Sequence, residues 1–454
     1  MMRLKKLGKE KQDFLNFFIY LKKRNFQGYT GLAIKNSFYQ FLTAFFGKIG
    51  SLVFTIILAR ILMPELFGLY SLALATIVVF VAFSDLGVQQ TLIRFVSKNL
   101  GKEKQGKANA YVKYLFKIKL FLVLGVSFVL VISAKFISAN YYQKPLFLAL
   151  LGGVLYIISI NLIYVVEALF QSFNKFKYPF FKEVFFQIIR LILVPLAVLV
   201  SLKYAFSHEA MLFLIFLALS FSYFLALVFI FFLMKKKLVF LKVKKEALTT
   251  SEKSELNKFM WPLSAIALSG VFFGYVDMIM LGRFVLAEFI GYYRVAFSLI
   301  ASAIYPLTFS FVLYPLFSRL KGQRLKRALT KSVKVTLLLS VCAALATLFL
   351  APYIIGIAFG NSYVESIPLL RLFALLLLSG PLTALYTSYI ISQGKPFIVA
   401  KLLIFSTLIN ICLNYFFITW FITYGQKWAI FGAAMATIIS CYFYLFGLIF
   451  CRKN

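Results

Sequence analysis

The feature that most constrains this chain is a series of long apolar runs. Each run covers about 20 to 28 residues, enough to cross the roughly 30 Å hydrocarbon core of a bilayer as a helix. Since 62% of the residues are hydrophobic and only 14% are charged, the composition excludes a soluble globular domain. The sequence therefore predicts an all-α integral membrane protein with about twelve transmembrane helices, at residues 38–62, 69–97, 111–135, 145–170, 182–202, 209–234, 259–283, 290–318, 333–358, 366–391, 398–421 and 428–450.

The segments between these runs differ in charge from one face to the other. Nearly all of their lysines and arginines lie on the face that carries both termini, whereas the opposite loops hold only Lys144, Lys203 and Lys427. Because basic loops are retained in the cytoplasm, we expect both termini on the cytoplasmic side of the membrane. The first 37 residues are then a cytoplasmic basic arm without a signal peptide, and basic segments such as 235–245 contact anionic membrane lipids.

A short segment between the first two runs recurs between the seventh and eighth. Residues 59–70 read "ARILMPELFGLY" and residues 282–293 read "GRFVLAEFIGYY". An offset of 223 pairs six identical residues within sixteen positions, among them Arg60 with Arg283 and Gly68 with Gly291. Six helices separate the copies, so both enter the membrane in the same orientation. This predicts two parallel-repeat six-helix lobes, at 38–234 and 259–454, joined by a basic cytoplasmic linker at 235–258 and facing a central cavity.

Cationic residues inside the spans point to an anionic ligand. A charge within a span is costly in lipid, so it usually faces the bundle interior or a water-filled cavity. Cations outnumber carboxylates here, and arginine and lysine are both suited to phosphate oxygens. We expect contacts to an anionic, lipid-linked phosphate from Lys48, Arg190, Arg60, Arg294 and Arg371.

Three of these assignments have a simpler alternative. Arg60 and Arg371 are near enough to the membrane surface to extend to the lipid headgroups. Lys48 could instead form a structural ion pair with Asp85 or Glu167. Two carboxylates, Asp277 and Asp85, are candidates for ion coupling or gating, although Asp277 could equally serve to hold a nearby arginine.

Other classes of function find little support in the sequence. The basic residues lie between the spans rather than on one surface, which argues against a nucleic-acid partner despite a net charge of +35. The single histidine, His208, lies in a short loop, no phosphate-binding loop is present, and the outer loops are short. We therefore expect no enzyme activity, neither glycosyltransferase nor polymerase, and no direct ATP hydrolysis. The four cysteines lack metal-ligand spacing, so no metal site or cofactor is expected.

Four segments together resemble a known family. "LARILMPELFGLYSLALA" is followed by "SDLGVQQTLIRFVSK", and late in the chain "SQGKPFIVAKLLIFSTLINICLNYFFI" is followed by "YGQKWAIFGAAMATIIS". They resemble the bacterial oligosaccharide repeat-unit flippases, the polysaccharide-biosynthesis branch of the MOP exporter superfamily, over nearly the whole chain. One departure is Met63, which stands where the family usually has glycine before the elbow proline.

The resemblance implies a fold and an activity. The fold is that of the MATE transporters, with two lobes around a cationic cavity. The activity is translocation of undecaprenyl-pyrophosphate-linked oligosaccharide units from the inner to the outer leaflet by alternating access, with polysaccharide polymerase and glycosyltransferases as partners. Asn410 and Asn414 are carried over as sugar contacts or, more simply, interhelical contacts. A lipid II flippase and a multidrug or cation extruder remain as alternatives.

Overall fold

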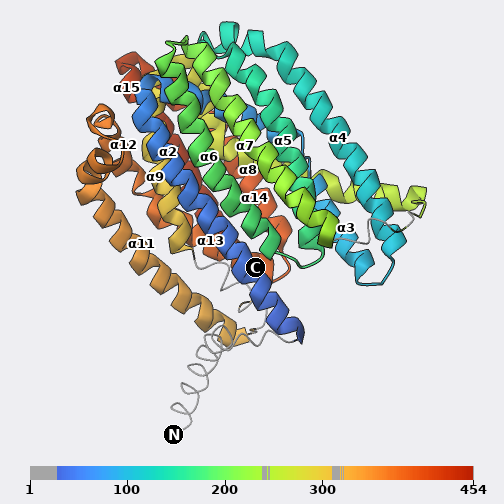
Figure 1. Cartoon of the computed structure of the whole chain (residues 1–454). Helices are drawn as coiled ribbons and strands as arrows, with labels where there is room; N and C mark the ends of the chain where they lie inside the picture. The colour runs from blue at the N-terminus through green and yellow to red at the C-terminus, as the bar shows by residue number, and fades with distance from the viewer. Residues whose placement is uncertain are drawn as a thin grey trace.

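The protein is a helical bundle throughout the part that the structure describes. This computed structural model describes residues 28–237, 243, 246–308, 317, 320 and 322–452, and contains no strand within them (Figure 1). Its first half comprises α2 (Gly28–Phe83), α3 (Val88–Leu100), α4 (Gln105–Lys135), η1 (Phe136–Tyr142), α5 (Phe147–Ser172), α6 (Lys177–Lys203) and α7 (His208–Lys237). Its second half comprises α8 (Thr250–Phe284), α9 (Ala287–Leu307), α11 (Gly322–Ala358), η3 (Asn361–Tyr363), α12 (Ser366–Phe373), α13 (Leu376–Ser392), α14 (Pro396–Phe421), η4 (Ile422–Tyr424) and α15 (Gln426–Cys451).

Helix α2 crosses the membrane twice. Its apolar part, Lys35–Phe83, has 49 residues, and at 1.5 Å per residue this corresponds to about 75 Å, more than twice a hydrocarbon core of roughly 30 Å. Met63 interrupts the helix with φ 60° and ψ 171°, directly before Pro64. Eleven helices of the described part are long and apolar enough to span a membrane. Since one of them crosses twice, they account for the twelve predicted crossings.

Two predicted helices are interrupted in the structure. The helix expected at 69–97 ends at Phe83, and residues 84–87 form a turn before α3. Gly87 adopts φ 75°, and a Cβ added to it would lie 2.8 Å from the Leu263 side chain of α8, so this turn requires glycine. The expected helix is therefore divided at this turn. The expected helix at 366–391 is likewise divided into α12 and α13.

Some predicted boundaries fall partly outside the described residues. This applies to the N-terminal arm, to the linker at 235–258 and to the end of the helix expected at 290–318. Within the linker range, α8 already begins at Thr250, where the Thr249 side chain and Glu252 form a reciprocal capping box.

The two halves repeat the same packing. In the first half α2 packs on α6, α6 on α7, α7 on α5 and α5 on α4. The corresponding pairs of the second half, α8 with α14, α14 with α15, α15 with α13 and α13 with α11, are also in contact. The lobes meet mainly where α2 of the first packs on α8 and α9 of the second. The two-lobed repeat is therefore confirmed.

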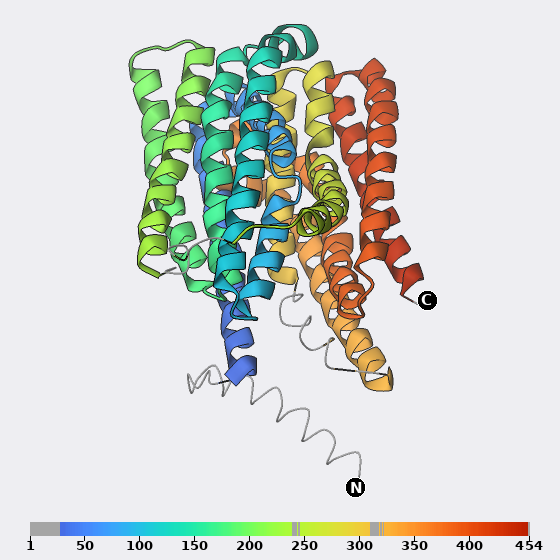
Figure 2. The ribbon, with the colours of Figure 1, turned by 90° about the vertical axis from the view of Figure 1, so that its right-hand side faces the viewer.

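The recurring elbows meet each other at one end of the lobe interface. Helix α2 begins and α15 ends at the same end of the bundle (Figure 2), and we call the opposite end, where both elbows lie, the distal end. A Cβ on Gly68 would lie 1.7 Å from the Ala287 carbonyl oxygen, and one on Gly291 would lie 2.2 Å from the Pro64 carbonyl oxygen. Both glycines therefore permit backbone contact between the lobes, and the distal end is closed.

Candidate functional site

Three of the five predicted cations converge at the lobe interface. Lys48 of α2 and Arg294 of α9 lie close enough to repel each other electrostatically. Arg190 of α6 and Arg294 both lie close enough to the buried Tyr70 hydroxyl to interact with it electrostatically. The group therefore combines two residues of the first lobe with one of the second. We call Lys48, Arg190 and Arg294 the cation cluster.

Two members of the cation cluster have little to neutralise them. Lys48 forms no hydrogen bond or ion pair with any residue that the structure describes. Arg294 donates only a long contact of 3.9 Å to the Met278 sulfur and lies 5.9 Å from the centre of the Tyr275 ring. The expected alternative, a structural pair between Lys48 and Asp85 or Glu167, is not formed, because these carboxylates bind Lys119 and Lys182 instead. An unneutralised cation beside a cavity is suited to an anionic ligand.

Arg190 has a different environment, built on one face of α6. Its guanidinium donates to the Gln187 side chain at 2.5 Å and to the Ser51 hydroxyl of α2 at 3.3 Å, and it lies 4.3 Å from the centre of the Phe54 ring. Gln187 in turn donates to Glu183 at 2.6 Å. The guanidinium is thus held in a fixed position, and its Nε has no partner within the described residues.

This face of α6 belongs to a buried charge network that the sequence interpretation missed. Lys182 is 5% exposed and lies 2.7 Å from a Glu167 carboxylate oxygen and 2.8 Å from one of Glu183. Together with Arg190 the network has two cations and two carboxylates, so its charges balance. The spacing of Glu183, Gln187 and Arg190 along one helical face was the available signal.

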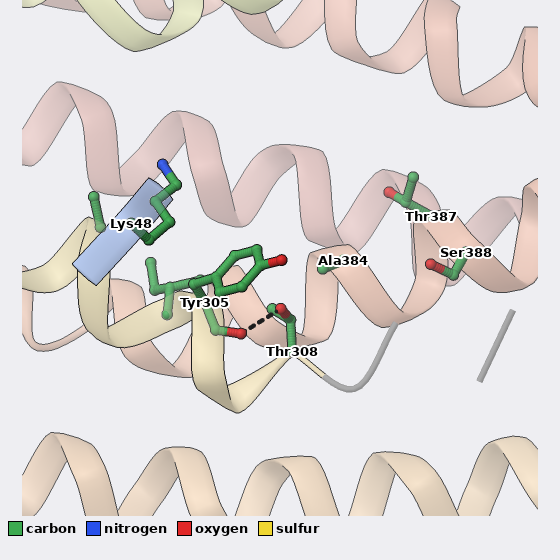
Figure 3. A pocket seen from close by; sticks show the side chains of 8 residues that line it. Lys48, Tyr305, Thr308, Ala384, Thr387 and Ser388 are labelled. Atoms are coloured by element: carbon green, nitrogen blue, oxygen red, sulfur yellow. Dashed lines mark hydrogen bonds between the residues drawn. The ribbon is translucent and has the colours of Figure 1, made fainter. Parts of the chain in front are cut away.

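A cavity of about 430 Å³ opens beside Lys48, between α2 of one lobe and α9 and α13 of the other. Figure 3 shows its lining, with Lys48 on one side and the hydroxyl side chains of Thr387 and Ser388 on the other. Thr308 also lines it, as does Tyr305. Among the described residues that line it there is no carboxylate. The cavity lies on the side of the elbows that faces the chain ends.

Two predicted contacts, Arg60 and Arg371, are not brought to the cation cluster. Arg60 donates from Nε to the Ala358 carbonyl at 2.7 Å, and also to the Ile357 carbonyl, at the end of α11 in the other lobe. Arg371 donates to the Leu348 carbonyl at 3.2 Å within its own lobe. Arg60 binds carbonyls in the last turn of α11, which is favourable at a helix C-terminus. Arg371 binds a carbonyl within α11 that has no helical partner, because Pro352, four residues later, lacks an N–H.

At the second elbow, an arginine of the second lobe binds helix carbonyls of the first lobe. Arg283 of the second lobe donates to the carbonyls of Asn140 and Tyr141 in η1 of the first lobe, at 2.9 and 2.8 Å. Next to it, Lys144 donates to the Gly282 carbonyl at 2.7 Å. Burial, together with the Arg283 charge, lowers the pKa of Lys144 to about 8. Each elbow arginine therefore ties its own lobe to the other.

Asp277 is buried in the second lobe without a cationic partner at ion-pair distance. It is 2% exposed and accepts hydrogen bonds from the Tyr293 hydroxyl and, at 2.8 Å, from the Met278 backbone N–H. The alternative role of holding Arg283 is not formed, since Arg283 binds η1. A buried carboxylate of this kind can take up a proton or a cation as its surroundings change.

Asp85 lies where the first lobe meets α8. It forms an ion pair with Lys119, which is only 1% exposed and therefore does not extend to the lipid headgroups. The adjacent Leu86 carbonyl accepts a hydrogen bond of 2.8 Å from Ser264 of the second lobe. The turn at 84–87 therefore carries a contact between the lobes.

Asn410 and Asn414 lie inside the second lobe rather than on the cavity. Both are fully buried on α14, and the Asn414 amide donates to the Asn410 carbonyl at 3.0 Å. Their side-chain oxygens have no hydrogen-bond partner within the described residues. No group of three or more His, Cys, Asp or Glu residues in the described ranges could hold a metal ion.

Comparisons with known proteins agree on the family and the fold. The family model described as polysaccharide biosynthesis protein matches residues 33–321. An inward-facing multidrug resistance MATE transporter of the MOP superfamily is 14% identical, with a TM-score of 0.68 over 90% of this chain and 96% of that one. The lipid II flippase MurJ in an inward closed conformation is 17% identical, with a TM-score of 0.68 over 91% of this chain and 87% of the other. A MOP superfamily transporter from Pyrococcus furiosus, whose binding pocket is described as having reverse polarity, is 13% identical, with a TM-score of 0.55 over 93% and 95%. Among curated proteins no match is found.

Proposed function

The chain belongs to the polysaccharide biosynthesis protein family, and from this premise we propose that it is a flippase for polyprenyl-pyrophosphate-linked oligosaccharide units. It carries them from the inner to the outer leaflet of a bacterial cytoplasmic membrane by alternating access. The observation that carries the proposal is the cation cluster, in which Lys48 and Arg294 come from opposite lobes, repel each other electrostatically and form no ion pair with any carboxylate of the described residues. An anionic headgroup bridging them would remove their mutual repulsion.

The charge of the cavity lining favours this substrate over a cationic one. Carboxylates in the central cavity would help an extruder to bind cationic drugs, and the described residues that line the cavity beside Lys48 include none. A pyrophosphate carries negative charge and several acceptor oxygens, which match the donors of lysine and arginine. A lipid II flippase meets the same chemical requirement. The match to the polysaccharide biosynthesis family supports an oligosaccharide substrate.

Alternating access follows from how the lobes are joined. In this state the elbows close the distal end, while the cavity lies toward the end that carries the chain termini. With the termini in the cytoplasm, as the charge of the loops predicts, this is a state that receives substrate from the inner leaflet. Breaking the distal contacts and closing the opposite end then releases the headgroup outside.

The membrane potential can supply the driving force. Moving two negative charges outward across about 100 mV, inside negative, is favourable by roughly 4 to 5 kcal/mol. Asp277 offers a second source, because a buried carboxylate that takes up a proton or cation in one state couples that ion to the lobe movement.

The test compares lysines in the cavity and outside it. In a host whose own copy is deleted, Lys48→Ala and Arg294→Ala should abolish surface polysaccharide at normal membrane levels of protein. Lys203→Ala, which removes the same charge in a distal loop, should support full export. If both cavity variants export as well as the parent chain, the cation cluster does not bind the substrate. Arg190→Lys should retain little activity if the planar guanidinium is needed.

A further inference from the structure

The cavity beside Lys48 has the chemistry of a sugar site next to a phosphate site. One side provides the Lys48 ammonium group, and the other provides hydroxyl groups of α9 and α13 (Figure 3). The wall between them includes Ala301, Ile304 and the Tyr305 ring. Apolar carbon and an aromatic ring suit the C–H faces of a pyranose, while hydroxyl groups suit its hydroxyls.

The lining is held in place from both lobes. The Tyr305 ring stacks on Phe41 of α2, with ring centres 6.3 Å apart and an angle of 18° between the planes. A Cβ on Gly380 of α13 would lie 2.7 Å from the Ile304 side chain of α9, so glycine brings these two helices together beside the cavity. The site therefore forms only when α2, α9 and α13 are in their present positions.

The hydroxyl groups differ in how far they are available to a ligand. Thr387 already forms a side-chain hydrogen bond with Tyr444 of α15, so its hydroxyl is only partly available. Figure 3 shows the Thr387 and Ser388 oxygens directed from α13 toward the space beside Tyr305. Thr308 donates its hydroxyl proton to the Tyr305 carbonyl at 2.6 Å, which leaves its oxygen as an acceptor. Ser388 forms no hydrogen bond with any residue that the structure describes. A pyranose hydroxyl can both donate and accept, so it can satisfy each of these groups.

The cavity is large enough for part of the substrate. Its volume of about 430 Å³ falls within the roughly 300 to 1,000 Å³ typical of small-ligand sites. This is sufficient for a phosphate and one sugar ring.

From this geometry we propose that Thr387 and Ser388 of α13 form a subsite for the sugar directly attached to the pyrophosphate, next to the phosphate contact at Lys48. The proposal rests on the proposed function. It means that selectivity resides in the first sugar rather than in the distal part of the glycan.

The experiment separates the sugar from the phosphate. The purified protein in nanodiscs is titrated with farnesyl diphosphate and with its glucose, galactose and N-acetylglucosamine conjugates. We expect at least one conjugate to bind about tenfold more tightly than bare farnesyl diphosphate. Thr387→Val and Ser388→Ala should each reduce that advantage about fivefold, the effect of one hydrogen bond, and leave the affinity for farnesyl diphosphate unchanged.

A matched control lies one turn further along α13. Ser392 donates to the Tyr389 carbonyl and does not line the cavity, so Ser392→Ala should bind every probe as the parent chain does. If farnesyl diphosphate binds in a Lys48-dependent manner and no sugar improves its affinity, the subsite is refuted while the proposed function stands. If no probe binds and Lys48→Ala leaves the amount of surface polysaccharide unchanged, the proposed function itself fails. Equal losses in Ser388→Ala and Ser392→Ala would also refute the subsite.

Discussion

The closed distal end depends on two glycines, and Gly68→Ala tests this directly. The added Cβ would lie 1.7 Å from the Ala287 carbonyl oxygen. Nonbonded carbon and oxygen atoms need about 3.2 Å, so the lobes must separate by roughly 1.5 Å at this point. The obstacle is backbone rather than a flexible side chain, and the whole elbow must therefore move. We expect Gly68→Ala to favour an open distal end and to lose transport.

The reciprocal variant should have a smaller effect. At Gly291 the added Cβ would lie 2.2 Å from the Pro64 carbonyl oxygen, so a separation of about 1 Å relieves the clash. Gly125→Ala is the matched control, because a Cβ there has no neighbouring atom within 4 Å. It adds the same methyl group to a membrane helix and should change neither conformation nor transport.

Electron paramagnetic resonance distances between the distal loops provide the assay. In a background without the four native cysteines, spin labels are attached at Tyr204→Cys and Tyr424→Cys, which are 64% and 67% exposed in opposite lobes. Gly68→Ala should move the distance distribution toward longer values, and Gly291→Ala should do so to a lesser degree. A distribution identical to that of Gly125→Ala, in a protein that elutes as a single folded species, would contradict direct contact between the elbows.

The remaining predictions use the same labels or thermal unfolding. Arg60→Ala removes two charge-assisted hydrogen bonds between the lobes, together about 2 kcal/mol at this exposed position. It should shift the equilibrium between the closed and the open distal end about thirtyfold toward the open state. Arg371→Ala, whose bond lies within one lobe, should leave this equilibrium unchanged, and an equal response of the two variants would refute the role of Arg60. Met63→Gly should stabilise the protein by about 1 kcal/mol, seen as a higher midpoint of thermal unfolding, because φ 60° with ψ 171° is a conformation that only glycine adopts without strain. The pKa of Lys144 is lowered to about 8 in the closed state and returns toward its ordinary value of about 10.4 when the side chain is hydrated, so opening of the distal end takes up a proton. The closed fraction should therefore rise between pH 8 and 10 and stay constant below pH 8. In Lys144→Met this pH dependence should be lost.

The helices, the repeat and the closed contact of the elbows differ in how far the sequence could predict them. Long apolar runs determine membrane helices almost by length alone, because in lipid the backbone must satisfy its own hydrogen bonds. The interruption at 84–87 required knowledge of α8, since Gly87 is needed where Leu263 approaches. The elbow identities were visible in the sequence, but the direct contact between Gly68 and Gly291 was not.

The candidate site could be predicted from the sequence less well than the fold. Arg60 and Lys48 look alike in sequence, as cations in an apolar run, and both were expected to bind an anion. Which acceptor an arginine reaches depends on helices far away in the chain, and Arg60 reaches carbonyls almost 300 positions later. The hydroxyl groups of Thr387 and Ser388 carried no signal, because serine and threonine are common in membrane helices and bond their own backbone there.

The two lobes have different roles at different positions, and this explains why some residues repeat between them and others do not. Two like-oriented lobes related by an axis along the bundle place equivalent elbow residues next to each other at that axis. The backbone contact therefore needs glycine in both copies, and Arg60 and Arg283 bind reciprocally across the interface. A ligand with one headgroup has no such symmetry. At the same offset of 223, Lys48 corresponds to Val271 and Arg294 to Ser71. Positions that close the distal end thus keep the repeat, whereas the positions proposed to bind the substrate have lost it. A search for such unmatched positions near a repeated elbow is a way to look for an anion site in other two-lobed chains.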